Sequence, residues 1–473
     1  MTYPNVLILD YLKSMKQATP ELQMQAEQYI AQGYQRLLTF EVPGGGFSLM
    51  GDPPAWVMLS AYGLMELHDM SRVHYVDPAL LERTARWLMD QQRPEGSWPP
   101  AGVSYAWQQL QNSDLPVTAY VAWAFIEAGY EDTPAVRRGL DYVRAHLNEA
   151  KDPYVLALIA NALAADNPEG EMTRQVLDWL EGMKAVEGDR VYWQSDAGSF
   201  MGGQGNAASI ETTALAAYAM LKSGLYLQTA NGALAYIVSQ KDSFGAWQTT
   251  QATILSLKAL LLAATQGAAG GQEATVRVLF NGEETDPIHI TPANADVVHL
   301  VTFTDKARPG DNFLNLEVEG QRALQYQVIS EYYLPWELVP EAVEEEAMAI
   351  EVGYDRTELA VNDVVTARAW IRLLQEGVAR MVLVDLGIPP GFSVLSEDLD
   401  RLVERGVIAR YELAGRQVIV YLENLSSEKA LQFEYRLRAR YPIKAKTPRS
   451  TVYDYYTPQT RGLQPPQEMV VTG

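Results

Sequence analysis

The sequence predicts a ring of α-helices followed by β domains, and three observations support this prediction. Up to Gln266, helices that are apolar on every side alternate with helices that are apolar on one face only. A unit of helix, glycine turn and tryptophan occurs twice in this part of the chain. After a glycine-rich linker at 267–271, the apolar period changes from that of a helix to that of a strand. Alternating buried and half-buried helices are typical of two concentric layers, so the expected fold class is α first and β afterwards.

The repeated unit consists of an amphipathic helix that ends at glutamine, a turn at glycine and a tryptophan two residues after that glycine. One copy covers 87–98 (WLMDQQRPEGSW) and the other covers 236–247 (YIVSQKDSFGAW). The shared positions are Gln91, Gly96 and Trp98 in the first copy and Gln240, Gly245 and Trp247 in the second. Glycine permits the turn and tryptophan fills the space beneath it. A repeat of this kind predicts stacked helix pairs.

The two kinds of helix form one alternating series. Helices predicted to be buried cover 4–17, 53–67, 117–128, 154–165, 210–221 and 249–264. One-faced helices cover 21–38, 79–92, a segment that begins at Thr133, 171–183 and 226–240. Six inner and five outer helices predict an α/α toroid of six helix pairs that is one outer helix short. Two explanations of the shortage stay open, namely missing chain before Met1 and a wrongly drawn helix.

Two β-sandwich-type domains are predicted after the ring. Strand alternation occurs over 274–280, 286–290, 297–303, 312–320 and 323–336, and again in a longer region that contains one short helix at 397–405. Strands at this spacing predict a sandwich. The predicted domains are the toroid at 1–266, a small β domain at 272–336, an acidic linker at 337–349, the sandwich at 350–460 and an unpacked tail at 461–473.

Composition excludes several classes of function. The 473 residues carry a net charge of −22 and no cysteine. A chain with this net negative charge lacks the basic face that nucleic acid or an anionic membrane requires. The simpler explanation of the charge is that it keeps the protein soluble. Without cysteine, the chain itself forms no disulfide, thiolate metal site or thioester. No apolar run approaches the ~20 residues of a membrane-spanning helix. The first residues do not resemble a signal peptide, so we expect a cytosolic protein or a piece of a longer one.

The last sandwich has the most specific sequence pattern. The segment 384–394 (VDLGIPPGFSV), the short helix after it and the segment 450–458 (STVYDYYTP) resemble the receptor-binding domain that closes α2-macroglobulin and complement C3-type proteins. In the ring, 3–12 (YPNVLILDYL) and 55–67 (AWVMLSAYGLMEL) resemble the thioester domain of the same family. The β unit at 272–336 resembles the part of the CUB-like domain that follows it. The resemblance covers nearly the whole chain, in the domain order of the family.

The resemblance implies a reactive bond that this chain does not itself contain. In the family, a Cys–Gly–Glu–Gln run forms an internal thioester, and cleavage of a bait region exposes it to amines or hydroxyls. That run would lie just before the segment matching Tyr3–Leu12, ahead of Met1, so we interpret the chain as a C-terminal fragment. A member without the cysteine is the alternative. Complement-type members have a catalytic histidine where 103–107 (VSYAW) stands here, and His74 and His146 lie outside this segment. The parent is therefore expected to prefer amines.

The resemblance also implies which side chains surround the thioester. Apolar groups protect such a bond because a wet acyl thioester hydrolyses. The expected surroundings are Tyr3, Tyr105, Trp107, Tyr453, Tyr455 and Tyr456. Ordinary strand packing is the alternative for the last three. No catalytic, cofactor-binding or metal-binding residue is predicted, and His289 and His299, on predicted strands, are too isolated for a metal site.

Two other functions stay open at this stage. A toroid enzyme acting on carbohydrates or terpenoids, with accessory β domains, would need paired acids. Asp114, Asp196 and Glu211 lie in or near loops between helices and are the candidates, although such acids are more often helix caps. The chain contains no two adjacent aspartates, which argues against a terpene cyclase. The third possibility is a surface adhesion protein that binds through the sandwich.

The favoured prediction is the C-terminal part of an α2-macroglobulin-like protease-trapping inhibitor, without enzymatic activity. Its expected partners are target proteases, bound through the full-length parent, and upstream macroglobulin domains. Nucleic acid and direct membrane insertion are not expected. The parent would work outside the cell or in the periplasm, with or without a membrane tether outside this fragment. The absence of cysteine favours a bacterial-type member, since vertebrate members carry disulfides.

Overall fold

The structure is a computed structural model. It describes residues 2–473 except 16–17, 101–112, 197, 201–202, 242–245, 248, 268–272, 292–293, 295–298, 305, 321–323, 325, 331, 333–346, 456–460 and the side chain of Arg380. The chain divides into two compact units, Met1–Ser330 and Glu331–Gly473.

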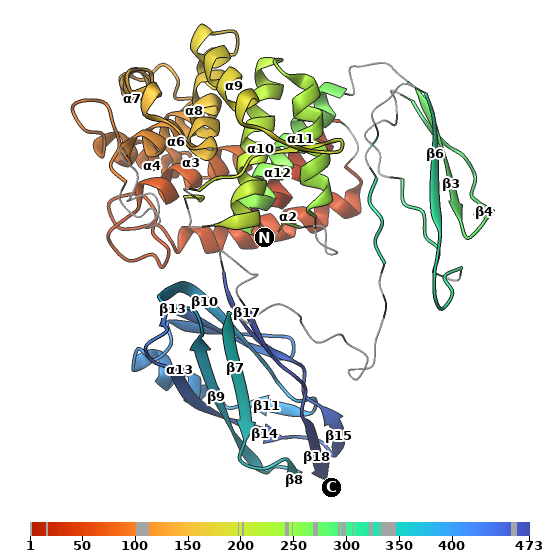
Figure 1. Ribbon diagram of the computed structural model, residues 1–473. Coiled ribbons are helices and arrows are strands. Elements are labelled where there is room, and N and C mark those ends of the chain that lie inside the picture. The colour runs from red at the N-terminus through yellow and green to blue at the C-terminus, as the bar shows by residue number, and fades with distance from the viewer. Residues whose placement is uncertain are drawn as a thin grey trace. The chain divides into compact units, whose positions relative to one another are not determined.

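The described part of the first unit contains eleven α-helices, which alternate between an inner and an outer layer. The inner helices are α1 (Thr2–Ser14), α3 (Val57–Ser71), α6 (Asp114–Glu127), α8 (Pro153–Asp166), α10 (Gly205–Ser223) and α12 (Thr250–Gly267). The outer helices are α2 (Pro20–Leu38), α4 (Pro78–Asp90), α7 (Pro134–His146), α9 (Glu171–Met183) and α11 (Leu227–Ser239). Each inner helix contacts the next one along the chain, and α12 contacts α1, so the ring closes (Figure 1). The predicted α/α toroid is confirmed.

Short sequence signals explain where several of these helices begin. Four of them start with a capping side chain followed directly by proline. These pairs are Thr19-Pro20, Asp77-Pro78, Thr133-Pro134 and Asp152-Pro153. The capping oxygen accepts a hydrogen bond from a backbone N–H that the helix leaves unsatisfied, and proline fits the first turn because it needs no donor there. The inner helices α3, α6, α8 and α10 are buried on nearly all sides, whereas α4, α7 and α9 bury one face only. The first inner helix, α1, was also predicted to be buried, but it buries only the face that carries Tyr3, Pro4, Val6 and Leu9.

The tryptophan of the repeat joins an outer helix to the next inner helix after α4, α9 and α11. Its indole N–H donates to a carbonyl near the end of the outer helix, and its backbone N–H donates to a threonine hydroxyl of the inner helix. The structure shows three copies: Trp98 with Leu88 and Thr118, Trp193 with Leu180 and Thr213, and Trp247 with Ile237 and Thr253. The indole bond is 2.7 Å long in each. All three side chains are fully buried, so the tryptophans of the repeat pack the inner and outer helices together.

The turn before Trp98 requires glycine. Gly96 has φ +99, and a Cβ there would lie 2.5 Å from the carbonyl oxygen of Arg138. Both facts exclude an ordinary side chain at this position.

The described β elements that follow the ring in the first unit form one antiparallel sheet around β3. Its strands are β3 (Ala274–Phe280), β4 (Glu283–Glu284), β5 (Ile288–Ile290) and β6 (Leu314–Gly320). The described residues 299–304 and 326–330 are not strands, so the predicted strands at 297–303 and 323–336 are wrong within those residues. Period-two alternation alone does not supply the partner whose N–H and C=O groups a strand needs. His299 therefore lies outside the sheet.

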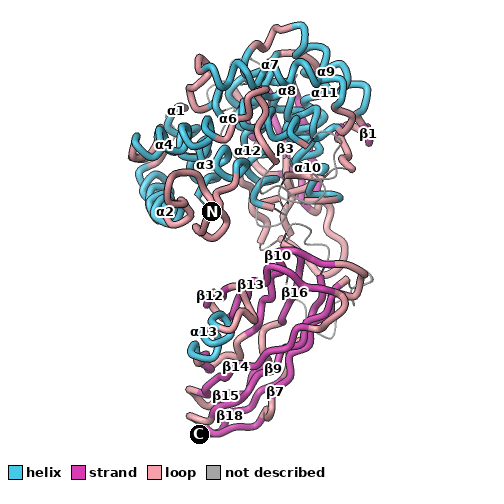
Figure 2. Tube along the Cα trace, turned by 90° about the vertical axis from the view of Figure 1, so that its left-hand side faces the viewer, coloured by secondary structure: helices cyan, strands magenta, loops and turns pink. Residues whose placement is uncertain are grey.

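The second unit is a β-sandwich with one helix, α13 (Ser396–Glu404) (Figure 2). Its strands are β7 (Met348–Tyr354), β8 (Glu358–Ala360), β9 (Val364–Leu373), β10 (Val378–Gly387), β11 (Phe392–Val394), β12 (Arg410–Ala414), β13 (Gln417–Ser426), β14 (Leu431–Ala439), β15 (Ile443–Lys446), β16 (Ser450–Asp454), β17 (Arg461–Gln464) and β18 (Glu468–Thr472). They form sheets in the orders β12-β13-β10-β16-β17, β11-β14-β9-β7 and β15-β18-β8. Alternate residues of β9 and β14 point into the core, as expected for a half-buried sheet.

The end of the chain is packed, which corrects the predicted tail at 461–473. Strand β17 pairs with β16, and β18 pairs with β15 and β8. Met469 and Val471 point into the sandwich core. The alternation is only five residues long and follows two prolines, so composition suggested an unpacked segment although partner strands were available.

Candidate functional site

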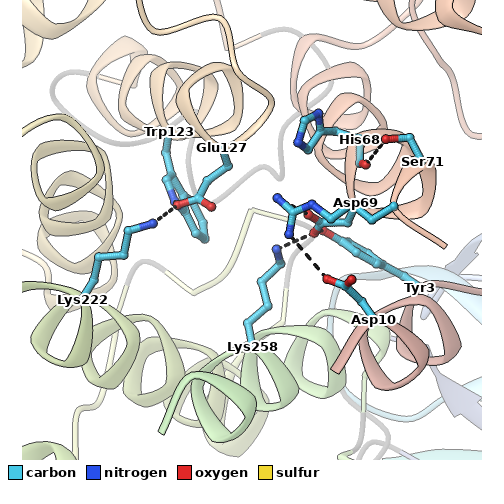
Figure 3. Close-up of polar contacts among 10 residues, drawn as sticks. Tyr3, Asp10, His68, Asp69, Ser71, Trp123, Glu127, Lys222 and Lys258 are labelled. Carbon is cyan, nitrogen blue, oxygen red and sulfur yellow. Dashed lines mark hydrogen bonds and ion pairs between the residues drawn. The ribbon is translucent and has the colours of Figure 1, made fainter. Parts of the chain in front are cut away.

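Three buried polar side chains meet where α1, α3 and α12 come together, and we call them the closure cluster (Tyr3, Asp69 and Lys258). The Tyr3 hydroxyl donates a hydrogen bond of 2.7 Å to Asp69 Oδ2, and Lys258 Nζ lies 2.8 Å from the same oxygen. The ammonium group also lies 5.4 Å from the centre of the Tyr3 ring. Figure 3 shows the three side chains converging from three helices. The pair Asp69–Lys258 is separated by 189 residues, so only the closed ring brings it together.

The charges of the closure cluster are set by its neighbours. Burial alone would raise the pKa of Asp69, but the Lys258 charge, together with hydrogen bonds from Lys258 and Tyr3, holds that pKa below its usual value. Burial and the neighbouring Asp69 carboxylate raise the pKa of Tyr3 well above its usual value. The Asp69 carboxylate is therefore held by one neutral hydroxyl, by Lys258 and, 3.7 Å from its other oxygen, by Arg72.

A second acid on α3 is in the opposite state. Glu66 is 3% exposed, and burial raises its pKa to about 8, in spite of a hydrogen bond from Tyr62. The nearby Asp69 charge also raises this pKa. Two acids one helical turn apart thus differ in ionisation because Asp69 has a cation and Glu66 has none among its partners in the described residues.

A third buried acid, Glu211 on α10, is surrounded by hydroxyl groups, and we call this group the hydroxyl cluster (Glu211, Tyr154, Ser199 and Thr249). Its carboxylate accepts hydrogen bonds from Tyr154 at 3.3 Å, from Thr249 at 3.2 Å and from Ser199. None of these partners carries a positive charge. Burial raises the pKa of Glu211 to about 7, although the hydrogen bonds lower it.

The three acids that the sequence suggested for catalysis do not form a catalytic group among the described residues. Asp114 pairs with Arg93 at the start of α6. The backbone N–H of Asp196 donates to Asp152, the capping residue of α8. Glu211 belongs to the hydroxyl cluster. Each acid therefore has its own structural partner, and no contact in the described residues joins one of them to another.

The residues expected around a thioester are partly described. Tyr3 is 2% exposed and belongs to the closure cluster. Tyr453, on β16, is half-buried, and burial followed by the charge of Asp385 raises its pKa. The backbone N–H of Tyr455 donates to the carbonyl of Met381. Tyr105, Trp107 and Tyr456 lie outside the described residues, as does the segment 103–107.

The structure adds two findings on metal sites and membranes. Among the residues that it describes, no group of three or more His, Asp or Glu side chains is arranged to hold a metal ion. His289 is exposed on β5 near Thr275, and His146 stacks on Tyr142. No described helix combines the length and the apolar character that crossing a bilayer requires.

The fold and these clusters define a class of protein. That class is an α/α-toroid domain, whose described buried acids contact cations or hydroxyl groups, in one chain with a separate β-sandwich. The sequence matches two family models, the A-macroglobulin TED domain over residues 1–262 and the A-macroglobulin receptor binding domain over residues 377–465. The chain therefore belongs to the α-macroglobulin family.

Relatives and solved structures agree with this assignment. Ovostatin of Gallus gallus is 24% identical over 96% of this chain, and thioester-containing protein 1 (allele R1) of Anopheles gambiae is 22% identical over 98%. The chain spans about a third of their length, 31% and 34% respectively. The fold is similar to Escherichia coli α2-macroglobulin from domain MG7 to the C-terminus, with a TM-score of 0.65, 15% identity, and coverage of 100% of this chain and 72% of that one. The fold is also similar to Salmonella α2-macroglobulin reacted with methylamine, with a TM-score of 0.66 and 16% identity. That comparison covers 100% of this chain and 30% of the other.

Proposed function

We propose that this chain is the thioester-domain and receptor-binding-domain portion of a protease-trapping inhibitor of the α2-macroglobulin type. The observation that carries the proposal is the order of the two family matches, 1–262 and 377–465, within a chain that two curated relatives match over nearly its full length. One of those relatives is named a thioester-containing protein, and one solved neighbour is described as reacted with methylamine. The reactive group in this proposal is an acyl thioester that an amine opens.

The chain's own residues would hold and shield that group. The chain contains no cysteine, so in this proposal the thiol is supplied by a segment of the parent that is not part of this chain. Tyr3 would lie directly after that segment, at the buried start of α1. The proposed shield consists of Tyr453, Tyr455, Tyr456, Tyr105 and Trp107. A shield is needed because a thioester survives only when water is kept away.

The acceptor of the acyl group is proposed to be an amine. No histidine occurs in 103–107 (VSYAW), so this segment offers no imidazole to transfer the acyl group to hydroxyls. Lysine side chains of a trapped protease are the expected targets. The proposed setting is the periplasm or the cell exterior, where upstream macroglobulin domains and a bait region would complete the trap.

The test uses the parent protein that includes the segment before Met1. A Cys-x-x-Gln sequence there, and release of one thiol per chain after methylamine, would support the proposal. Glycerol at the same concentration should release at least tenfold less thiol if amines are preferred, since the histidine-assisted route is absent. A parent that releases no thiol with either reagent, or that leaves a protease fully active on a large substrate and a small one alike, would refute the trap.

A further inference from the structure

The closure cluster lies at the one junction of the ring that joins the first inner helix to the last. All other inner neighbours follow one another along the chain, whereas α1 and α12 meet only because the ring closes. At this junction Lys258 of α12 and Asp69 of α3 both reach the side chain of Tyr3, in the first turn of α1 (Figure 3).

We propose that Asp69 and Lys258 are positioning residues that hold Tyr3 and thereby fix the first turn of α1. The inference rests on the proposed function in one respect: the reactive segment is expected directly ahead of this turn, so whatever holds Tyr3 also sets the position of that segment. Neither residue needs to touch the thioester.

The geometry supports a positioning role because one carboxylate oxygen receives both contacts. Asp69 Oδ2 accepts from the Tyr3 hydroxyl at 2.7 Å and from Lys258 Nζ at 2.8 Å. Apolar packing limits the position of the aromatic ring of Tyr3. One such contact is the edge-on contact with Tyr62, with aromatic ring centres 5.7 Å apart. A charged acceptor in addition fixes the direction of the hydroxyl, since hydrogen bonds to ionised groups are strong and directional.

Two ion pairs further along α1 are more exposed than the closure cluster. Arg72 lies 3.5 Å from Asp10, and Lys13 lies 3.2 Å from Glu27, with side chains 32–49% exposed. The side chains of Asp69 and Lys258 are each 9% exposed. Solvent screens the first two pairs far more than the buried one. Of these three contacts, the one at the start of α1 is therefore the least screened by solvent.

The first experiment measures hydrogen exchange of residues 2–9 in the chain of 473 residues. Tyr3→Phe keeps the ring and removes the hydroxyl, so it should speed exchange of these amides about tenfold with little change in Tm. Lys258→Met should do the same and also lower Tm. Lys222→Met is the matched control, because Lys222 pairs with Glu127 at 2.8 Å between α10 and α6, away from α1. Unchanged exchange in both Tyr3→Phe and Lys258→Met would overturn the inference.

A double variant separates positioning from stability. Asp69→Leu with Lys258→Met removes both charges and should recover most of the Tm, since an apolar pair of similar size often replaces a buried ion pair without loss. Tyr3 would still lack its acceptor, so exchange at residues 2–9 should stay fast. Recovery of slow exchange together with Tm would show that the cluster only stabilises the ring.

The second experiment measures the rate of thiol release from the reactive segment in the parent. Without any amine, Tyr3→Phe should release thiol about tenfold faster than the wild type, whereas Lys222→Met should match the wild type. A wild-type parent that never releases thiol with methylamine refutes the proposed function, while the exchange result still decides whether Asp69 and Lys258 hold Tyr3. Normal thiol release by the wild type and equally slow spontaneous release by Tyr3→Phe would refute the positioning role alone.

Discussion

Asp69 and Glu211 are both buried carboxylates on inner helices of the same ring, but their surroundings give them different ionisation. One carboxylate oxygen of Asp69 accepts a hydrogen bond from Lys258, and the pKa of Asp69 is lowered. Glu211 has three hydroxyl partners, and its pKa is raised to about 7. Hydroxyl groups do stabilise a carboxylate, but here they do not offset the cost of removing its charge from water. The nature of the partner, rather than burial alone, decides whether a buried acid is charged.

The comparison has a structural meaning as well. The closure cluster joins the ends of the ring through an ion pair, whereas the hydroxyl cluster joins α8, α10 and the start of α12 through neutral donors. Removing one partner should therefore harm the first cluster at every pH at which Asp69 is ionised, and the second cluster mainly where Glu211 is ionised.

The largest effect is expected for Lys258→Met. The variant leaves the buried Asp69 carboxylate with the Tyr3 hydroxyl on one oxygen and with Arg72 3.7 Å from the other, so we expect a loss of about 3–5 kcal/mol in the free energy of unfolding at pH 7. Urea unfolding followed by the fluorescence of the ring tryptophans measures it. Asp69→Leu with Lys258→Met is the control and should recover most of the loss. A loss below about 1 kcal/mol in the single variant would show that Arg72 replaces Lys258.

The next effect is the pH dependence that Glu211 confers. Its pKa in the folded protein lies above the ordinary 4.5, so the folded state retains a proton that the unfolded state releases. The associated stability is fully present below about pH 4.5 and is lost as pH rises to about 7, in total roughly 3 kcal/mol. In Glu211→Gln the slope of stability against pH between 5 and 7 should be smaller than in the wild type by up to about 1.4 kcal/mol per pH unit.

Glu66→Gln provides the comparison for that measurement. Glu66 has its pKa raised to about 8, so it adds a second slope that extends to higher pH. The double variant should lose both of these slopes and keep those of other groups, such as Asp385, whose pKa burial raises to about 6. Identical slopes in the wild type and in Glu211→Gln would contradict the raised pKa of Glu211.

A smaller effect is expected for Thr249→Val, which removes one hydroxyl from the hydroxyl cluster. Thr249 also accepts the N–H of Ala252 at the start of α12, so the variant should lose about 1 kcal/mol at any pH. A further loss of about 1–2 kcal/mol should occur only above about pH 7, where Glu211 is ionised and needs the donor. Thr249→Ser keeps the hydroxyl and should show neither loss. Unfolding at pH 5 and pH 8 distinguishes the two contributions, and equal losses at both would exclude the second.

The smallest effect is expected for Lys222→Met. Lys222 lies 2.8 Å from Glu127, with side chains that are 35% and 15% exposed, so water and salt weaken the pair. A loss below about 1 kcal/mol is expected, and 0.5 M salt should reduce it further. Parallel urea titrations at low and high salt test this, with Lys258→Met in the same series. A Lys222→Met loss as large as that of Lys258→Met would remove the distinction between buried and exposed pairs.

Local sequence patterns predicted most of the fold. Alternation between all-round and one-faced apolar helices identified six inner and five outer helices. The third copy of the tryptophan repeat, at Trp193, was missed because the hairpin of β1 (Ala185–Glu187) and β2 (Arg190–Tyr192) lengthens the turn. A search that allowed insertions between the helix end and the tryptophan would have found it.

The candidate sites were less predictable from sequence. Tyr3 was named through a family resemblance, but its partners Asp69 and Lys258 carried no local signal: Asp69 looks like an ordinary acid near a helix end, and Lys258 like a cation on an apolar helix. Glu211 was named as a possible catalytic acid, yet its hydroxyl partners come from three separate segments. Side chains distant in sequence meet through packing, which a local pattern does not encode.

By itself, the sequence determined the helices of the ring and most strands of the sandwich, because helix and strand periods, caps and turns act over a few residues at a time. Tertiary structure alone decided the charge state of each buried acid and the pairing of the final strands β17 and β18. The physical reason is that desolvation and ion pairing depend on which groups surround an atom in space. For Asp69 and Lys258 those groups are 189 residues apart along the chain.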